Sequence, residues 1–208
     1  MAESIGVLGG AFDPPHIGHL ILGETAREQL GLDRVLFLPT GEPPHKEDRD
    51  VTAAHHRLAM TKLAITEDDY FDASAIDVDR PAPHYTSTLR PYLLEAFPGA
   101  DLILVIGGDS LSDLPRWHEP QSIVAQWRIA VLPRPQSTLD WHKLAQCVPG
   151  VHDVTTILDG PSVAISSTQI RRWVSAGRKL RYLMPTAVAQ YIRENGLYPQ
   201  GDSVEMEG

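Results

Sequence analysis

Short apolar segments alternate with longer segments of helical periodicity along this chain. The apolar segments, rich in Val, Ile and Leu, predict strands at 4–8, 34–39, 71–78, 101–107 and 128–133. Helical spacing recurs between them, over 18–30, 52–65 and 86–97. In the first of these segments, Leu22, Ala26 and Leu30 lie four residues apart and form one apolar stripe.

Most of the predicted strands are continuously apolar, a pattern typical of a parallel sheet that is buried on both faces. Such strands in alternation with helices indicate an α/β fold with a doubly wound parallel sheet. Ligands of this fold class bind beyond the carboxyl ends of the strands, so we expect the chemistry in the loops that follow them. Glycine, proline and polar residues predict adaptable loops at 40–50 and 134–140.

The C-terminal part, residues 166–198, reads as two helices. Ser166 with Gln169 matches a capping box at the first helix, and Pro185 suits the first turn of the second. We expect these helices to form a small subdomain against the edge of the sheet.

The composition indicates one globular domain, predicted over residues 1–198, with a flexible tail at 199–208. The chain has 18 Lys+Arg and 27 Asp+Glu, and its net charge of -9 argues against broad binding to nucleic acid or anionic membranes. The lone Cys147 excludes an internal disulfide and is typical of a reducing compartment. We see no signal segment and no apolar run of about 18 residues, so we expect a cytoplasmic protein.

The segment GVLGGAFDPPHIGHL, residues 6–20, joins the first predicted strand to the first predicted helix. Gly9 and Gly10 allow the backbone to turn and to approach a ligand closely. His16 and His19 lie three residues apart, on one face of the opening helical turn, where unpaired amides favour an anion. Two imidazoles in this place can donate hydrogen bonds to a phosphate that gains charge during a reaction.

The histidine pair has three alternative interpretations. A zinc site usually has an i, i+4 spacing or further Cys or carboxylate ligands nearby, and none is close in sequence. The histidines can also be packing or capping groups without chemistry. A dinucleotide-binding loop needs G-x-G-x-x-G, which this segment lacks. The pattern favours the phosphate site, and we name no metal ligand in the protein.

The sequence GGAFDPPHIGHL resembles the G-x-F-D-P-x-H-x-G-H signature of the nucleotidyltransferase superfamily, in particular of the bacterial nicotinate-mononucleotide adenylyltransferases. The resemblance extends from about residue 6 to 198 and implies a Rossmann-like nucleotidyltransferase fold. It implies that His16 and His19 are catalytic, binding the ATP phosphates and stabilising the transferring α-phosphoryl group. It also implies ATP-binding positions at Gly9, Gly10 and Phe12.

The segment ISST begins the first predicted C-terminal helix and offers a second anion site. Ser167 and Thr168 supply hydroxyls and unpaired amides, and Arg171 can reach the same anion one turn later. Taken alone, serine and threonine at this place are most often plain helix caps. The order S-S-T-x-x-R resembles the family's second phosphate-binding signature. The family often has a further arginine where this chain has Trp173, which leaves open whether Arg171 or Arg172 faces phosphate.

Three further ATP contacts are implied by the resemblance. In VIGGDSL a predicted strand ends at Gly107, which is assigned to ATP, and Asp109 is assigned to the ribose hydroxyls, with a helix N-cap as the alternative. Arg134 matches an arginine that the family uses near ATP, with a solvent-exposed charge as the alternative.

The acceptor side is assigned on three segments. His45 and Lys46 in PPHK resemble the loop that meets the acceptor phosphate. Trp117 matches a residue that stacks on the pyridine ring, with surface packing as the alternative. Tyr85 and Thr86 resemble a segment whose backbone amides receive the nicotinate carboxylate, although this copy is one residue shorter than the usual form.

The implied reaction joins ATP and nicotinate mononucleotide into the deamido dinucleotide and releases pyrophosphate. A carboxylate only accepts hydrogen bonds whereas an amide also donates them, so a pocket of N–H groups predicts preference for the acid. The acceptor phosphate needs no protein base, since its second pKa lies near ~6. Mg²⁺ is expected to arrive with ATP. We expect no nucleic-acid or membrane partner, and the sequence leaves homo-oligomerisation open.

Other interpretations stay open at this stage. Within the superfamily, the acceptor can instead be nicotinamide mononucleotide, phosphopantetheine or a phospho-alcohol that receives CMP. A nucleotide-binding regulator without turnover and a synthetase-like protein that charges RNA are the alternatives from other classes.

Overall fold

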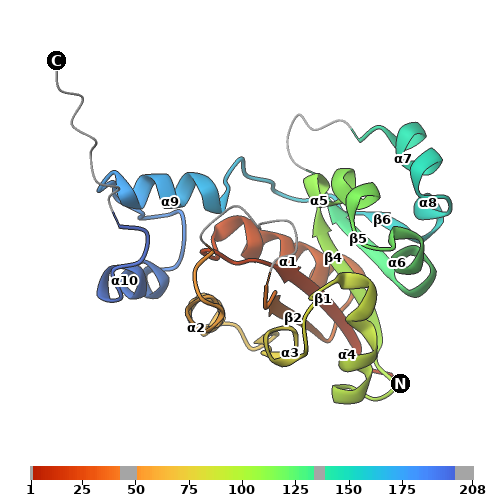
Figure 1. Cartoon of the computed structure of the whole chain (residues 1–208), viewed down its shortest axis with the longest axis horizontal. Coiled ribbons are helices and arrows are strands. Elements are labelled where there is room, and N and C mark those ends of the chain that lie inside the picture. Colours follow the sequence, from red (N-terminus) through yellow and green to blue (C-terminus); the bar gives the residue numbers. More distant parts are fainter. Residues whose placement is uncertain (1, 43–50, 134–138, 200–208) are drawn as a thin grey trace.

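The computed structural model describes residues 2–42, 51–133 and 139–199. Six parallel strands form one sheet in the order β3-β2-β1-β4-β5-β6, as predicted for a doubly wound α/β fold (Figure 1). The strands are β1 (Ser4–Gly10), β2 (Arg34–Pro39), β3 (Phe71–Ala73), β4 (Asp101–Gly107), β5 (Arg128–Leu132) and β6 (Thr155–Ile157).

Helices connect the strands and cover both faces of the sheet (Figure 1). The longer ones are α1 (Ile17–Leu30), α2 (Ala54–Ile65), α9 (Ser167–Ser175) and α10 (Thr186–Glu194). The shorter ones are α3 (Ile76–Asp79), α4 (Arg90–Ala96), α5 (Gly108–Asp113), α6 (Pro120–Gln126), α7 (Trp141–Cys147) and α8 (Val151–Val154), with 3₁₀ turns η1 (Thr86–Thr88) and η2 (Leu114–Arg116).

Alternate strand residues supply two separate apolar clusters, one on each face of the sheet. In β2, Val35 and Phe37 belong to the first cluster, and Leu36 and Leu38 to the second. The first cluster is completed by side chains of α1, α2, α9 and α10, and the second by side chains of α4, α5, α6, α7 and α8. Burial on both sides explains why β2 reads as a continuous apolar run.

Two predicted elements differ from the structure, and one strand was not predicted. The strand predicted over 71–78 ends at Ala73, because the backbone turns at Ser74, whose hydroxyl accepts a hydrogen bond from the Ile76 N–H (3.2 Å), and α3 follows. The helix predicted over 86–97 is split into η1 and α4. The last strand, β6, has three residues and too short an apolar pattern to be predicted.

The strand order changes direction at β1, which has β2 on one side and β4 on the other. A crevice at such a switch point is the usual ligand site of a doubly wound sheet. The segment after β6 crosses back over the molecule to α9, so that the C-terminal helices return to the side of α1 and α2 (Figure 1).

The C-terminal helices rest on other helices. The Ile17 N–H donates to the Leu183 carbonyl (2.9 Å), and Nδ1 of His56 on α2 lies 2.9 Å from the Tyr191 hydroxyl on α10. Since α2 itself contacts β2 and β3, the expected contact with the sheet edge is made through α2. Pro185 is the N-cap residue of α10 and does not occupy its first turn.

Much of the predicted loops and tail falls on residues 43–50, 134–138 and 200–208, outside the described part of the chain. The single-domain boundary at residue 198 stays a prediction.

Candidate active site

A cavity of about 260 Å³ lies at the carboxyl ends of β1 and β4, at the switch point of the sheet. The starts of α1, α5 and α9 meet there, so three sets of backbone N–H groups surround it. Its lining includes seven predicted site residues: Gly9, Gly10, His16, His19, Gly107, Asp109 and Ser167. The structure therefore brings together segments that are about 150 residues apart in sequence.

The two histidines form one unit at the start of α1. Their rings stack at 3.7 Å between centroids, and His16 is buried as the N-cap residue of the helix. Nδ1 of His19 accepts the backbone N–H of His16 (3.1 Å). An imidazole nitrogen that accepts a hydrogen bond carries no proton, so the network leaves neutral His19 with its proton on Nε2. His19 thus both caps the turn and keeps a donor.

The sequence around the histidines fits this packing. A Cβ at Gly18 would lie 3.1 Å from the His16 ring and from the Ile165 side chain, so only glycine lets both approach the helix start without displacement. Phe12 is buried and its ring meets His19 edge to face, with 4.9 Å between centroids. Phe12 therefore supports His19 from the core. It is not among the cavity-lining residues, so its contact with ATP stays a prediction.

The start of α9 is joined directly to the loop of residues 10–16, which we call the signature loop. The predicted capping box is present, since the Ser166 hydroxyl accepts the Gln169 N–H (3.3 Å) and the Gln169 side chain accepts the Ser166 N–H (3.0 Å). The Ser167 hydroxyl donates to the Pro14 carbonyl (2.9 Å). These bonds hold the helix start against the histidine motif.

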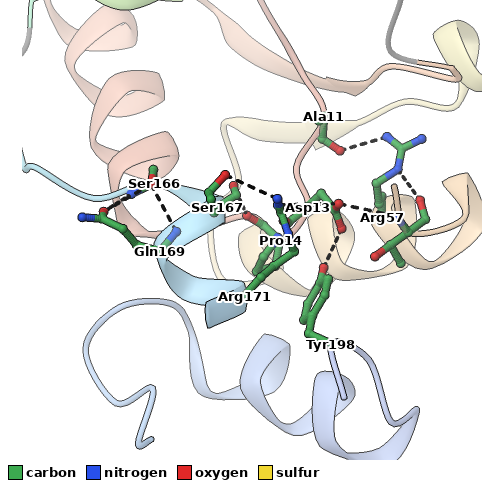
Figure 2. A network of polar contacts seen from close by, with 11 residues as sticks. Ala11, Asp13, Pro14, Arg57, Ser166, Ser167, Gln169, Arg171 and Tyr198 are labelled. Atoms are coloured by element: carbon green, nitrogen blue, oxygen red, sulfur yellow. Dashed lines mark hydrogen bonds and ion pairs between the residues drawn. The ribbon is translucent and has the colours of Figure 1, made fainter. Parts of the chain in front are cut away.

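Arg171 points at the signature loop, and Arg172 is exposed. Arg171 donates to the Asp13 carbonyl (2.7 Å) and lies 3.7 Å from the Asp13 carboxylate, as Figure 2 shows. It also donates to the Thr168 hydroxyl (3.3 Å). Neither Arg171 nor Thr168 is among the cavity-lining residues, so their contact with phosphate stays a prediction.

The Asp13 carboxylate is the centre of a buried network that sequence reasoning missed (Figure 2). It accepts the Tyr198 hydroxyl (2.7 Å) and the Thr52 N–H (3.4 Å). Asp13 stands inside the signature motif, but Tyr198 is 185 residues away in sequence and no local pattern pairs the two.

Tyr198 is expected to make the unfolding free energy of the protein fall at alkaline pH. Burial and the adjacent Asp13 charge raise the pKa of Tyr198 above its ordinary value of 10.0. Its contribution is therefore complete below pH 10 and is lost at higher pH, where the unfolded chain releases the proton and the folded chain keeps it. We expect this group to lower the unfolding free energy by about 1.4 kcal/mol per pH unit above its ordinary pKa. Urea unfolding of the protein and of Tyr198→Phe across this range measures the difference, and equal slopes would contradict it.

The remaining predicted ATP residues have mixed outcomes. Asp109 lies in the first turn of α5 and lines the cavity, while Gly107 occupies the N-cap position. The alternative of Asp109 as an N-cap is therefore wrong. Arg134, like His45 and Lys46 of the acceptor side, lies outside the described residues.

The two described acceptor-side segments lie side by side. The rings of Tyr85 and His118 stack at 4.1 Å with an angle of 4° between their planes, and the Ser87 hydroxyl lies 3.0 Å from His118 Nδ1. Trp117 precedes His118 and packs, half-buried, against the second apolar cluster. Thr86, next to Tyr85, begins η1.

A larger cavity of about 900 Å³ lies elsewhere, between α1, α2 and the start of α10. It contains no predicted site residue, and its lining carries the carboxylates of Glu24, Glu28, Glu67, Asp68 and Asp159. Such a surface repels a triphosphate. The smaller cavity is therefore the candidate active site.

The described residues offer neither a cluster of metal ligands nor a membrane-spanning helix. No group of three or more His, Cys, Asp or Glu side chains in this part of the chain is arranged to hold a metal ion. None of the described helices is both long and apolar enough to cross a membrane.

Comparison with known proteins gives consistent results. A family model described as cytidylyltransferase-like matches residues 7–173. "Probable nicotinate-nucleotide adenylyltransferase" of Roseiflexus sp. (strain RS-1) is 44% identical over 195 residues, which cover 93% of this chain and 97% of the relative. The protein of the same name from Thermomicrobium roseum is 43% identical over 194 residues, covering 93% and 91%.

A solved structure shares the fold. Plasmodium falciparum nicotinic acid mononucleotide adenylyltransferase complexed with NaAD matches with a TM-score of 0.77 at 17% identity, covering 94% of this chain and 97% of that one. The resemblance stated from the histidine motif is confirmed by the family model and the relatives. The chain therefore belongs to the cytidylyltransferase-like family and, within it, to the nicotinate-nucleotide adenylyltransferases.

Proposed function

We propose that this protein transfers AMP from ATP to nicotinate mononucleotide, giving nicotinate adenine dinucleotide and pyrophosphate. The acceptor phosphate oxygen forms a bond to the α-phosphorus, and the bond from this phosphorus to the bridging oxygen of pyrophosphate breaks. The observation that carries the proposal is the convergence of the histidine pair and the α9 start on one cavity. The names of the relatives supply the acceptor.

The cavity supports binding of the ATP phosphates. Negative charge is stabilised where helix N-termini converge, and α1 and α9 both begin at this cavity. His19 offers its Nε2–H to the α-phosphoryl oxygens, and His16 lies stacked behind it. Asp109 lines the same cavity and is assigned to the ribose hydroxyls. Arg134, Ser167, Thr168 and Arg171 are assigned to ATP by motif.

The acceptor is received by the segments around Tyr85 and Trp117, with His45 and Lys46 assigned to its phosphate. The reaction then needs positioning and charge stabilisation more than a protein base. ATP enters as its Mg²⁺ complex, with the ion held by phosphate oxygens and water.

A panel of acceptors tests the proposal. Pyrophosphate release is measured with ATP and nicotinate mononucleotide, nicotinamide mononucleotide or phosphopantetheine, with and without Mg²⁺. We expect kcat/KM for the acid to exceed that for the amide by about tenfold or more, because a pocket of N–H donors leaves the amide's NH₂ unpaired. Equal efficiency with acid and amide would contradict the predicted preference for the acid. No turnover with any acceptor would contradict the proposed AMP-transfer activity.

A further inference from the structure

Arg57 on α2 is a fully buried cation that none of the motifs assigns. Its guanidinium is bonded to three backbone carbonyls from three separate segments. Nη1 donates to Ala11 (2.9 Å), Nη2 to Gly41 (2.6 Å) and Nε to Thr52 (2.7 Å). Arg57 therefore ties the signature loop to the chain just after β2 and to the chain just before α2. Figure 2 shows its contact with Ala11.

Burying the Arg57 cation is unfavourable, and the three bonds that it makes are specific to an arginine side chain. Burial lowers the pKa of Arg57, while the charges of Asp13, Tyr198 and Asp77 oppose that effect. An apolar side chain often replaces a buried ion without loss of stability, but it makes no directional bond to a carbonyl. A lysine keeps the charge and has three donors, but all three lie on one nitrogen, so it cannot reproduce the spacing with which the three guanidinium nitrogens meet these carbonyls. The arrangement fixes the relative positions of the three segments.

A second buried arginine continues the connection toward the acceptor side. Gly41 packs closely against the buried His84 ring, since a Cβ at Gly41 would lie 2.5 Å from the nearest ring atom. The Asp77 carboxylate of α3 accepts Nε of Arg80 at 2.6 Å. Both side chains of this ion pair are almost completely buried. Arg80 in turn donates to the carbonyls of Pro83 (3.3 Å) and Tyr85 (3.1 Å).

The result is one continuous chain of contacts, which we call the arginine chain. Its residues in order are Ala11, Arg57, Gly41, His84 and Tyr85, and the Asp77–Arg80 pair holds the segment from Pro83 to Tyr85. At one end, Ala11 lies between Gly10 of the cavity and Phe12, which supports His19. At the other end, the Tyr85 ring stacks on His118.

We infer that Arg57 is a positioning residue which, through Gly41 and the Asp77–Arg80 pair, sets the separation between the ATP side and the acceptor side of the active site. The inference rests on the proposed function, because that function places ATP at the first end and the acceptor at the second. Transfer requires the acceptor oxygen in line with the α-phosphorus, and a misplacement of about 1 Å lowers the rate of such a step by about a hundredfold. Arg57 and Arg80 act on this geometry without touching either substrate.

The test is a double-mutant cycle with Arg57→Lys and Arg80→Lys. Each single variant is expected to lower kcat by about tenfold or more, with KM for ATP changed by less than about twofold. Because both residues act through one chain, the double variant should lose little more than the worse single variant. Effects on kcat that multiply, or an unchanged kcat in Arg57→Lys, would overturn the inference.

A matched control separates positioning from stability. Met60→Ala removes a buried side chain from the same helix without touching the arginine chain. It should lower the urea midpoint but leave kcat per folded molecule within about twofold. If Met60→Ala lowers kcat as much as Arg57→Lys, the effect is general destabilisation and the inference fails.

A substitution at Gly41 gives a second route should Arg57→Lys not fold. A Cβ at Gly41 would lie 2.5 Å from the nearest atom of the buried His84 ring, so Gly41→Ala displaces the chain without altering a charge. It replaces Arg57→Lys in the cycle, with the same expected result. The unmodified protein is assayed in parallel: if it does not transfer AMP, the proposed function fails, and if it does while the cycle is additive, only this inference fails.

Discussion

Replacing His19 by alanine should lower kcat by about two to three orders of magnitude, the loss typical when one donor to developing charge is removed. His19 stands at the start of a 14-residue helix and lines the cavity. Its Nδ1 is occupied by the His16 N–H, so Nε2–H is the group that can reach a phosphoryl oxygen. The loss should therefore appear in kcat, since the donor acts most strongly on the transition state.

Two further variants distinguish the roles of the two ring nitrogens of His19. His19→Asn retains an acceptor where Nδ1 caps the His16 N–H, but it has no donor at the place of Nε2. His19→Gln reaches the Nε2 position with an N–H donor and loses the cap. We expect His19→Asn to be nearly as inactive as His19→Ala, and His19→Gln to recover about tenfold in kcat.

The measurement is steady-state pyrophosphate release, with urea unfolding of each variant as the control for folding. If His19→Asn keeps nearly full turnover while His19→Gln does not, the cap is the important role and the donor is not. Near-normal turnover of His19→Ala would remove His19 from the chemistry altogether.

The sequence alone predicted the parts of the fold that are set by local pattern. Strands such as 34–39 and 101–107 are buried on both faces over their central residues, 35–38 and 102–106, so these positions are all apolar and the pattern is plain. The Ser166–Gln169 capping box is a local contact and was predicted correctly. The histidine motif was placed at the start of α1, because its glycines, prolines and spacing all act within one turn.

Contacts between distant segments could not be predicted in this way. Arg57 lies in a helix of ordinary composition, and nothing in that sequence indicates that its side chain is buried. Its three carbonyl partners are seen only in the structure. Asp77 was read as part of a strand, whereas it forms a buried ion pair within one helical turn. Tyr198 is paired with Asp13 by the return of the C-terminal helices to α2, a tertiary feature with no sequence period.

Replacing Asp13 by alanine should lower the unfolding free energy by about 3 kcal/mol, a large part of the stability of a typical domain. The Asp13 side chain is 2% exposed. Its removal leaves the Tyr198 hydroxyl and the Thr52 N–H without their acceptor and takes away a charge that favours the buried Arg57 cation. Each buried group that loses its partner costs about 1–3 kcal/mol.

A matched ion pair on the surface provides the comparison. Asp101 and Arg128 lie 2.7 Å apart, closer than the 3.7 Å between Asp13 and Arg171, but their side chains are 47% and 60% exposed. Water solvates each partner when the other is removed, so Asp101→Ala should cost less than about 1 kcal/mol. Urea unfolding of the two variants shows whether the loss of unfolding free energy depends on the distance between the charges or on their burial. If Asp101→Ala costs as much as Asp13→Ala, the buried network does not hold the signature loop to the C-terminal helices.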